Sequence, residues 1–202
     1  MNDLDKALAD IVEIKSRLAR SSEFLGLGPA ALAASGALAF LVALAQSILP
    51  GATDPFAYFA AWVATAFAAC ALIGAEMLRR SRRHHAGLAD QMIREAVLHF
   101  VPAGMAGAAL LAFFARFAPD QLWLVPGLWL ILVSLGIFAA ARSLPSGMIY
   151  AGAWYFLAGF TVLLLAATGH ALNPWSMGLP FALGQCGIAL LVHRATEAAN
   201  AR

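Results

Sequence analysis

The chain has 202 residues, of which 62% are hydrophobic and 12% are charged. Soluble domains are about 45–50% apolar and about 25% charged, so a water-soluble domain of this size could not bury so much apolar surface. The same composition excludes a disordered chain. The net charge of +2 is too balanced to suggest a nucleic-acid partner. The composition therefore indicates an integral membrane protein.

The first predicted element is an amphipathic helix within a cytoplasmic segment over residues 1–24. Its polar face is mixed, with four basic and four acidic residues, whereas a helix that lies on anionic lipid is predominantly basic. The mixture favours docking onto a protein or self-association. Packing against the bundle and binding to lipid are the alternatives. The predicted docking residues are Leu4, Leu8, Ile11, Ile14, Leu18, Arg17 and Arg20.

Six apolar stretches follow, each close to the roughly 20 residues that a helix needs to cross a 30 Å hydrocarbon core. They form a predicted transmembrane domain over residues 25–194. Short connections with turn-forming residues lie at 50–55 and 118–121, and Asn173 before Pro174 predicts the N-cap of the last helix. The expected spans are about 27–49, 56–78, 98–118, 122–141, 148–169 and 175–193.

Basic residues predict the orientation of these spans. If the N-terminus is cytoplasmic, 12 of the 13 Lys and Arg residues lie on the cytoplasmic side, and only Arg116 lies outside. The expected fold class is therefore an all-α integral membrane protein with six transmembrane helices in three hairpins. Both termini are expected in the cytoplasm, with a basic hairpin at 79–97 and a tail at 195–202.

The basic hairpin has two interpretations. It can hold anionic lipid head groups, at about 1 kcal/mol per basic residue near the surface, or it can act only as a topology signal. Residues 90–99 are expected to continue the third span as a helix into the cytoplasm. The arginines concerned are Arg79, Arg80, Arg82 and Arg83.

Small and polar residues predict how the spans associate. In lipid, helices associate through close packing of small side chains and a few hydrogen bonds. Prolines inside spans three, four and six (Pro102, Pro126 and Pro180) are expected to kink those helices. The mid-span polar residues, expected to bond between helices, are Ser35, Thr65, Ser134, Thr161 and Gln185. The predicted packing residues are Ala66, Cys70, Gly74, Gly104, Gly107, Ala108, Gly152, Gly159, Gly184 and Gly187.

The sequence contains no motif typical of a catalytic centre. No ionisable residue lies near the middle of a span, which counts against a secondary transporter. There is no Ser/His/Asp grouping, no paired carboxylates and no phosphate-binding glycine loop, so we expect no enzymatic activity and no cofactor. His99 and His193 are weaker candidates for a haem or metal site, if spans three and six are neighbours.

The N-terminal pattern resembles a group of uncharacterised bacterial inner-membrane proteins. Their N-terminal helix and Arg-Ser-Ser-x-Phe-like turn are similar to Leu8, Ile11, Ile14 and Leu18 followed by Arg20-Ser21-Ser22-Glu23-Phe24. Their C-terminal segment is similar in its pattern of Trp175, Gly178, Gly184 and His193. This chain departs from them at Gly26-Leu27-Gly28-Pro29. The resemblance implies a multi-pass protein of the bacterial inner membrane with no known activity. Because such proteins are often encoded beside small winged-helix regulators, it also implies a cytoplasmic regulator as partner.

Together these observations favour a non-enzymatic membrane protein that anchors, senses for or docks a cytoplasmic protein. The expected partners are the bilayer and either a cytoplasmic protein or further copies of the chain, with no direct contact to nucleic acid. One alternative is a binder or carrier of a small apolar or amphipathic ligand within the bundle. A weaker alternative is a haem- or metal-binding membrane protein.

Overall fold

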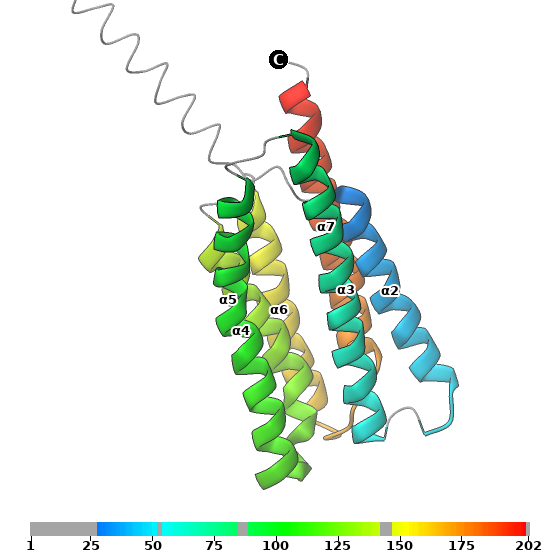
Figure 1. Cartoon of the computed structure of the whole chain (residues 1–202). Coiled ribbons are helices and arrows are strands. Elements are labelled where there is room, and N and C mark those ends of the chain that lie inside the picture. The colour runs from blue at the N-terminus through cyan, green and yellow to red at the C-terminus, as the bar shows by residue number, and fades with distance from the viewer. Residues whose placement is uncertain (1–27, 52–53, 85–88, 142–146, 201–202) are drawn as a thin grey trace, which may run out of the picture.

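The computed structural model describes residues 28–51, 54–84, 89–141 and 147–200, and for 80–84, 89–97, 99 and 198–200 it describes the backbone alone. Every regular element within these ranges is a helix (Figure 1). Six helices are long and apolar enough to cross a membrane. They are α2 (Pro29–Ile48), α3 (Pro55–His84), α4 (Ala89–Phe117), α5 (Val125–Ala140), α6 (Met148–Ala166) and α7 (Trp175–Asn200), and a 3-10 helix η1 (Pro119–Leu124) leads into α5.

Side chains cap two of the helix starts. Asp54 Oδ2 accepts hydrogen bonds from the backbone N–H groups of Phe56, at 3.2 Å, and Ala57, at 3.4 Å, at the beginning of α3. The side-chain oxygen of Asn173 accepts a 2.9 Å bond from the N–H of Trp175, which confirms the predicted cap of α7. These bonds satisfy N–H groups that have no partner within the helix.

The three prolines expected to kink helices are not equivalent. Pro102 and Pro180 lie inside α4 and α7. Pro126 lies in the first turn of α5, so the prediction of a kink there is wrong. The reason is that η1 forms the first part of this span, and α5 begins only at Val125. In a first turn the missing N–H of proline costs no intrahelical hydrogen bond.

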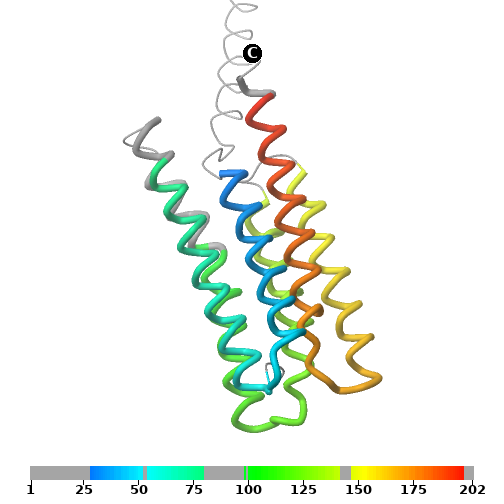
Figure 2. The backbone as a smooth tube through the Cα atoms, turned by 90° about the vertical axis from the view of Figure 1, so that its right-hand side faces the viewer, coloured from blue at the N-terminus to red at the C-terminus, as the bar shows by residue number. Residues whose placement is uncertain are grey.

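The helices lie side by side with successive helices running in opposite directions (Figures 1 and 2). The most extensive packing is between α2 and α7 and between α5 and α6. Less extensive contacts join α4 to α5, α2 to α3 and α6 to α7, and α3 touches α4 only slightly. The two largest interfaces therefore join spans one and six and spans four and five, rather than the two members of one expected hairpin.

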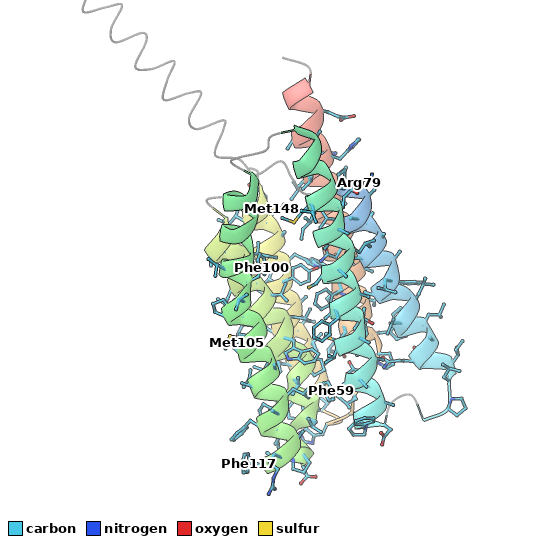
Figure 3. The ribbon with its side chains drawn as sticks, viewed as in Figure 1. Phe59, Arg79, Phe100, Met105, Phe117 and Met148 are labelled. Atoms are coloured by element: carbon cyan, nitrogen blue, oxygen red, sulfur yellow. The ribbon has the colours of Figure 1, made fainter. Side chains whose placement is uncertain are left out.

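Two clusters of buried side chains fill the bundle. The first contains Tyr155, Leu130 and Val192 and extends to Met148, near the end where α3 finishes (Figure 3). The second is rich in aromatic residues and includes Phe59, near the opposite end. We call the end at which α2 begins and α3 finishes the basic end, because Arg79 and the arginines that follow it lie there.

The helices contribute unequally to this core. In α4, only 6% of the apolar window Phe100–Phe117 is buried, compared with 44% of the window Pro119–Ala140 that η1 and α5 form. The window of α3 is also little buried, at 17%. The helices α2, α5, α6 and α7 therefore form the packed centre, and α3 and α4 lie at its periphery.

Candidate functional site

The predicted docking residues, from Leu4 to Arg20, lie outside the described residues. What the structure describes is the end of the bundle to which their segment is joined, since α2 begins at Pro29. Its backbone also contains Arg80, Arg82 and Arg83 in the last turns of α3, although their side chains are not described.

Helices continue past their apolar parts at the basic end. The apolar window of α3 stops at Arg79, but the helix runs on to His84. The helix α4 begins at Ala89, eleven residues before its window starts at Phe100. At 1.5 Å per residue, these eleven residues add about 16 Å of helix. Most of the predicted 79–97 connection is thus helical, and the expected helical extension over residues 90–99 is confirmed.

Arg79 is the described arginine of this end. Its Nε atom lies 3.3 Å from Glu76 Oε2, one turn earlier in α3. The glutamate side chain is only 18% exposed, whereas that of Arg79 is 65% exposed. The guanidinium group is therefore paired on one side and still open to the surroundings of the bundle (Figure 3).

The two candidate metal ligands lie on separated helices. The helix α4, which contains His99, packs mainly on α5, and α7, which contains His193, packs mainly on α2 and α6. His193 Nε2 lies 3.3 Å from Glu197 Oε1 on the next turn, and both side chains are more than half exposed. The side chain of His99 is not described. Among the described residues, no three His, Cys, Asp or Glu side chains are grouped so that they could hold a metal ion.

About half of the predicted packing residues lie where helices meet. The indole N–H of Trp129 donates a 3.0 Å hydrogen bond to the carbonyl oxygen of Gly107, which joins α5 to α4. On α7, a Cβ atom at Gly184 would lie 2.5 Å from the hydroxyl oxygen of Tyr155. Gly152 and Gly159 of α6 make similarly close approaches to α5. Glycine at these positions therefore permits the observed helix spacing.

The other predicted packing residues do not lie in an interface of the described residues, so that prediction is wrong for them. A Cβ atom built on Gly74, Gly104 or Gly187 would meet no described atom within 4 Å. Ala66, Cys70 and Ala108 are exposed as well. Conversely, the spacing analysis missed Gly36 and Gly127, whose positions are closely packed. Spacing alone shows that a helix has a flat face, but not that a neighbour covers it.

The mid-span hydroxyl groups mostly bond within their own helices. Ser35 Oγ donates to the Leu32 carbonyl and Thr65 Oγ1 to the Ala61 carbonyl, both at 2.7 Å, and Thr161 Oγ1 donates to the Leu157 carbonyl at 2.9 Å. The expectation of bonds between helices is wrong for these three, because a Ser or Thr hydroxyl can reach a carbonyl one turn earlier. Ser134 Oγ and Gln185 Oε1 are buried without a hydrogen-bond partner among the described residues, as is the Tyr155 hydroxyl.

Near the opposite end, hydrogen bonds connect three parts of the chain. The amide nitrogen of Gln46 in α2 donates to the carbonyl oxygen of Tyr58 in α3 at 3.3 Å. The hydroxyl of Tyr58 donates to the carbonyl oxygen of Asn173, just before α7, at 3.1 Å. Gln46 and Tyr58 are both buried, so these bonds tie α2, α3 and the start of α7 together.

Replacing Tyr58 with phenylalanine is expected to destabilise the bundle by about 1 kcal/mol, since it removes one hydrogen bond and leaves the ring in place. Thermal unfolding of the purified protein measures the effect. Tyr150→Phe is the matched control, because the side chain of Tyr150 is 74% exposed. Equal melting temperatures for the two variants would show that the Tyr58 hydroxyl contributes nothing to stability.

The described residues thus present a helical, basic end and a packed bundle with two peripheral helices. These features are surfaces for interaction with other molecules, and they provide the material from which function can be inferred. No protein-family model, curated protein or solved structure matches this chain.

Proposed function

We propose that this chain is a non-enzymatic multi-pass protein of a bacterial inner membrane whose basic end docks a cytoplasmic protein. In this proposal the six spans form three hairpins and both termini lie in the cytoplasm. The N-terminal amphipathic helix provides the apolar docking face. The extensions of α3 and α4 provide the charged surface beside it.

The observation that carries the proposal is the length of helix at the basic end. Antiparallel spans can be joined by a few residues, as α2 and α3 are between Ile48 and Pro55. The helices α3 and α4 are instead joined through extensions of both, and that of α4 is eleven residues long. Such extensions are unnecessary for crossing the bilayer, and they present structured surface to proteins in the adjoining solution.

The charges of this region support a protein partner. The extension of α4 contains Asp90, Arg94 and Glu95, so both signs are present on it. The N-terminal helix is also mixed, with four basic and four acidic residues. Mixed charge around an apolar face favours recognition of a protein, whereas membrane-surface helices have a mostly basic polar face. A cytoplasmic regulator is the partner implied by the resemblance of the N-terminal pattern.

The ligand-carrier alternative has weaker support. A ligand with a hydroxyl group could satisfy the buried polar atoms of Ser134, Tyr155 and Gln185. However, the Tyr155 hydroxyl is packed against α7, because a Cβ atom at Gly184 would lie only 2.5 Å from it. We therefore prefer docking as the function.

The test uses aspartate substitutions on the predicted apolar face. Leu8→Asp and Ile11→Asp are each expected to reduce the amount of partner that co-purifies with the tagged protein by about tenfold or more, because they place a charge in an apolar interface. Quantitative mass spectrometry of the purified complex measures the effect. Asp10→Asn on the polar face is the control and should change little.

Deletion of residues 1–20 is expected to leave insertion intact and to abolish partner capture and self-association. A reporter fused to the C-terminus shows whether orientation is preserved. Unchanged capture by Leu8→Asp, Ile11→Asp and the deletion would reject the proposal. A C-terminus reachable only from the periplasm would reject it as well.

A further inference from the structure

The helices α3 and α4 are consecutive in the chain but pack together only slightly, and they stand apart in Figure 1. Toward the end opposite the basic end, aromatic side chains fill the region between them. The ring of Phe59 in α3 meets that of Trp129 in α5 edge to face, with centroids 5.7 Å apart. Leu111 and Phe114 of α4 pack against the same cluster. The side of α3 on which Phe59 lies is therefore directed toward α4 and α5.

Toward the basic end, this side of α3 has small residues in place of aromatic ones. Ala66, Cys70 and Gly74 follow Phe59 by seven, eleven and fifteen residues, which are close to whole numbers of helical turns. All three are exposed. On α4, Gly104 precedes Leu111 by seven residues and is likewise exposed. We call the exposed strip formed by Ala66, Cys70, Gly74 and Gly104 the α3–α4 seam.

The α3–α4 seam leads toward a concentration of positive charge. Arg79 lies five residues after Gly74, and Arg80, Arg82 and Arg83 follow it on the same helix. Glu76 offsets one of these charges through its contact with Arg79. Arginine suits phosphate recognition because its guanidinium group offers several donors in a fixed plane. Basic residues at the membrane surface also attract anionic lipids.

We propose that the α3–α4 seam holds an acyl chain of an anionic phospholipid whose phosphate is bound by Arg79 and the arginines after it. The small side chains leave room for the chain, and the arginines match the charge of the head group. A second helix of protein could also use a strip of small residues, but it would not account for the arginines at its end. The lipid site goes beyond the docking function and does not depend on a cytoplasmic partner.

The charge is tested with the purified protein in detergent. Phosphatidylglycerol and phosphatidylcholine with identical acyl chains are added, and native mass spectrometry measures how much of each remains bound. We expect preferential retention of phosphatidylglycerol, and an affinity about fivefold lower for Arg79→Gln. Arg194→Gln, which removes a charge from the same end but from α7, is the matched control. Equal retention of the two lipids, or an equal loss with Arg194→Gln, would overturn the proposal.

The acyl-chain position is tested with leucine substitutions at two open glycines. Gly104→Leu should fill the α3–α4 seam and reduce phosphatidylglycerol retention several-fold. Gly187→Leu on α7 should not, although Gly187 has equally open surroundings. Thermal unfolding checks that both variants are folded. Unchanged retention by Gly104→Leu would overturn the seam as the acyl-chain site, even if Arg79→Gln weakened binding. Because no partner protein is present, failure here is separate from failure of the docking proposal.

Discussion

Replacing Gly178 with leucine is expected to destabilise the protein by about 3 kcal/mol, since overpacking at a tight contact costs this much or more. Gly178 lies in α7 where this helix meets α2, and a Cβ atom there would collide with the Cβ atom of Ala43. Neither atom belongs to a flexible side chain that could turn away. The helices must therefore move apart along an interface that is the most extensive in the structure.

Thermal unfolding in lipid nanodiscs measures this loss as a lower melting temperature for Gly178→Leu. Gly187→Leu is the matched control, because it makes the same substitution in the same helix at a position where a Cβ atom would meet nothing within 4 Å. The control is expected to melt close to the unaltered protein. If both variants lost the same stability, the penalty would come from leucine in α7 in general and not from the α2–α7 contact.

The contact between α5 and α6 predicts a comparable effect from a smaller change. A Cβ atom at Gly159 would lie 2.9 Å from the carbonyl oxygen of Gly127 and 3.1 Å from the backbone nitrogen of Ile131. These are backbone atoms, so they cannot move without shifting the whole helix. Even Gly159→Ala should therefore cost about 2 kcal/mol, within the usual range for an overpacked interior.

The control for Gly159→Ala is Gly104→Ala in α4, where the added methyl group meets no described atom within 4 Å. It is expected to be neutral or slightly stabilising, because alanine favours a helix more than glycine does. Residual helicity after a heat step, measured by circular dichroism, compares the two variants. Equal stability of the two alanine variants would contradict the close approach of α5 and α6.

These expectations share one physical cause. Lipid tails are as apolar as leucine, so helices in a bilayer gain little from hiding apolar surface from each other. They associate where backbones approach closely enough for many van der Waals contacts. Gly127 and Gly159 allow such an approach between α5 and α6, and Gly178 allows it between α2 and α7. A methyl group at one of these positions removes more contact than it adds.

Some features of this protein follow from the sequence alone because their causes are local. The thickness of a hydrocarbon core sets the length of an apolar stretch, and on this criterion the sequence predicted six spans, matched by six helices long and apolar enough to cross a membrane. The cap at Asn173 depends only on residues up to Trp175, and it is present as expected. The docking residues of the N-terminal segment, in contrast, lie outside the described residues and stay a prediction.

Other features depend on which helices become neighbours, and only the tertiary structure decided them. Ala66, Cys70 and Gly74 have the spacing of a packing stripe but are exposed, whereas Gly36, outside any predicted stripe, packs against Gln185 of α7. The four-residue period of small side chains creates a flat helix face whatever lies beside it. Whether another helix covers that face depends on the arrangement of all six helices, because each can approach only the backbones that the others leave within reach.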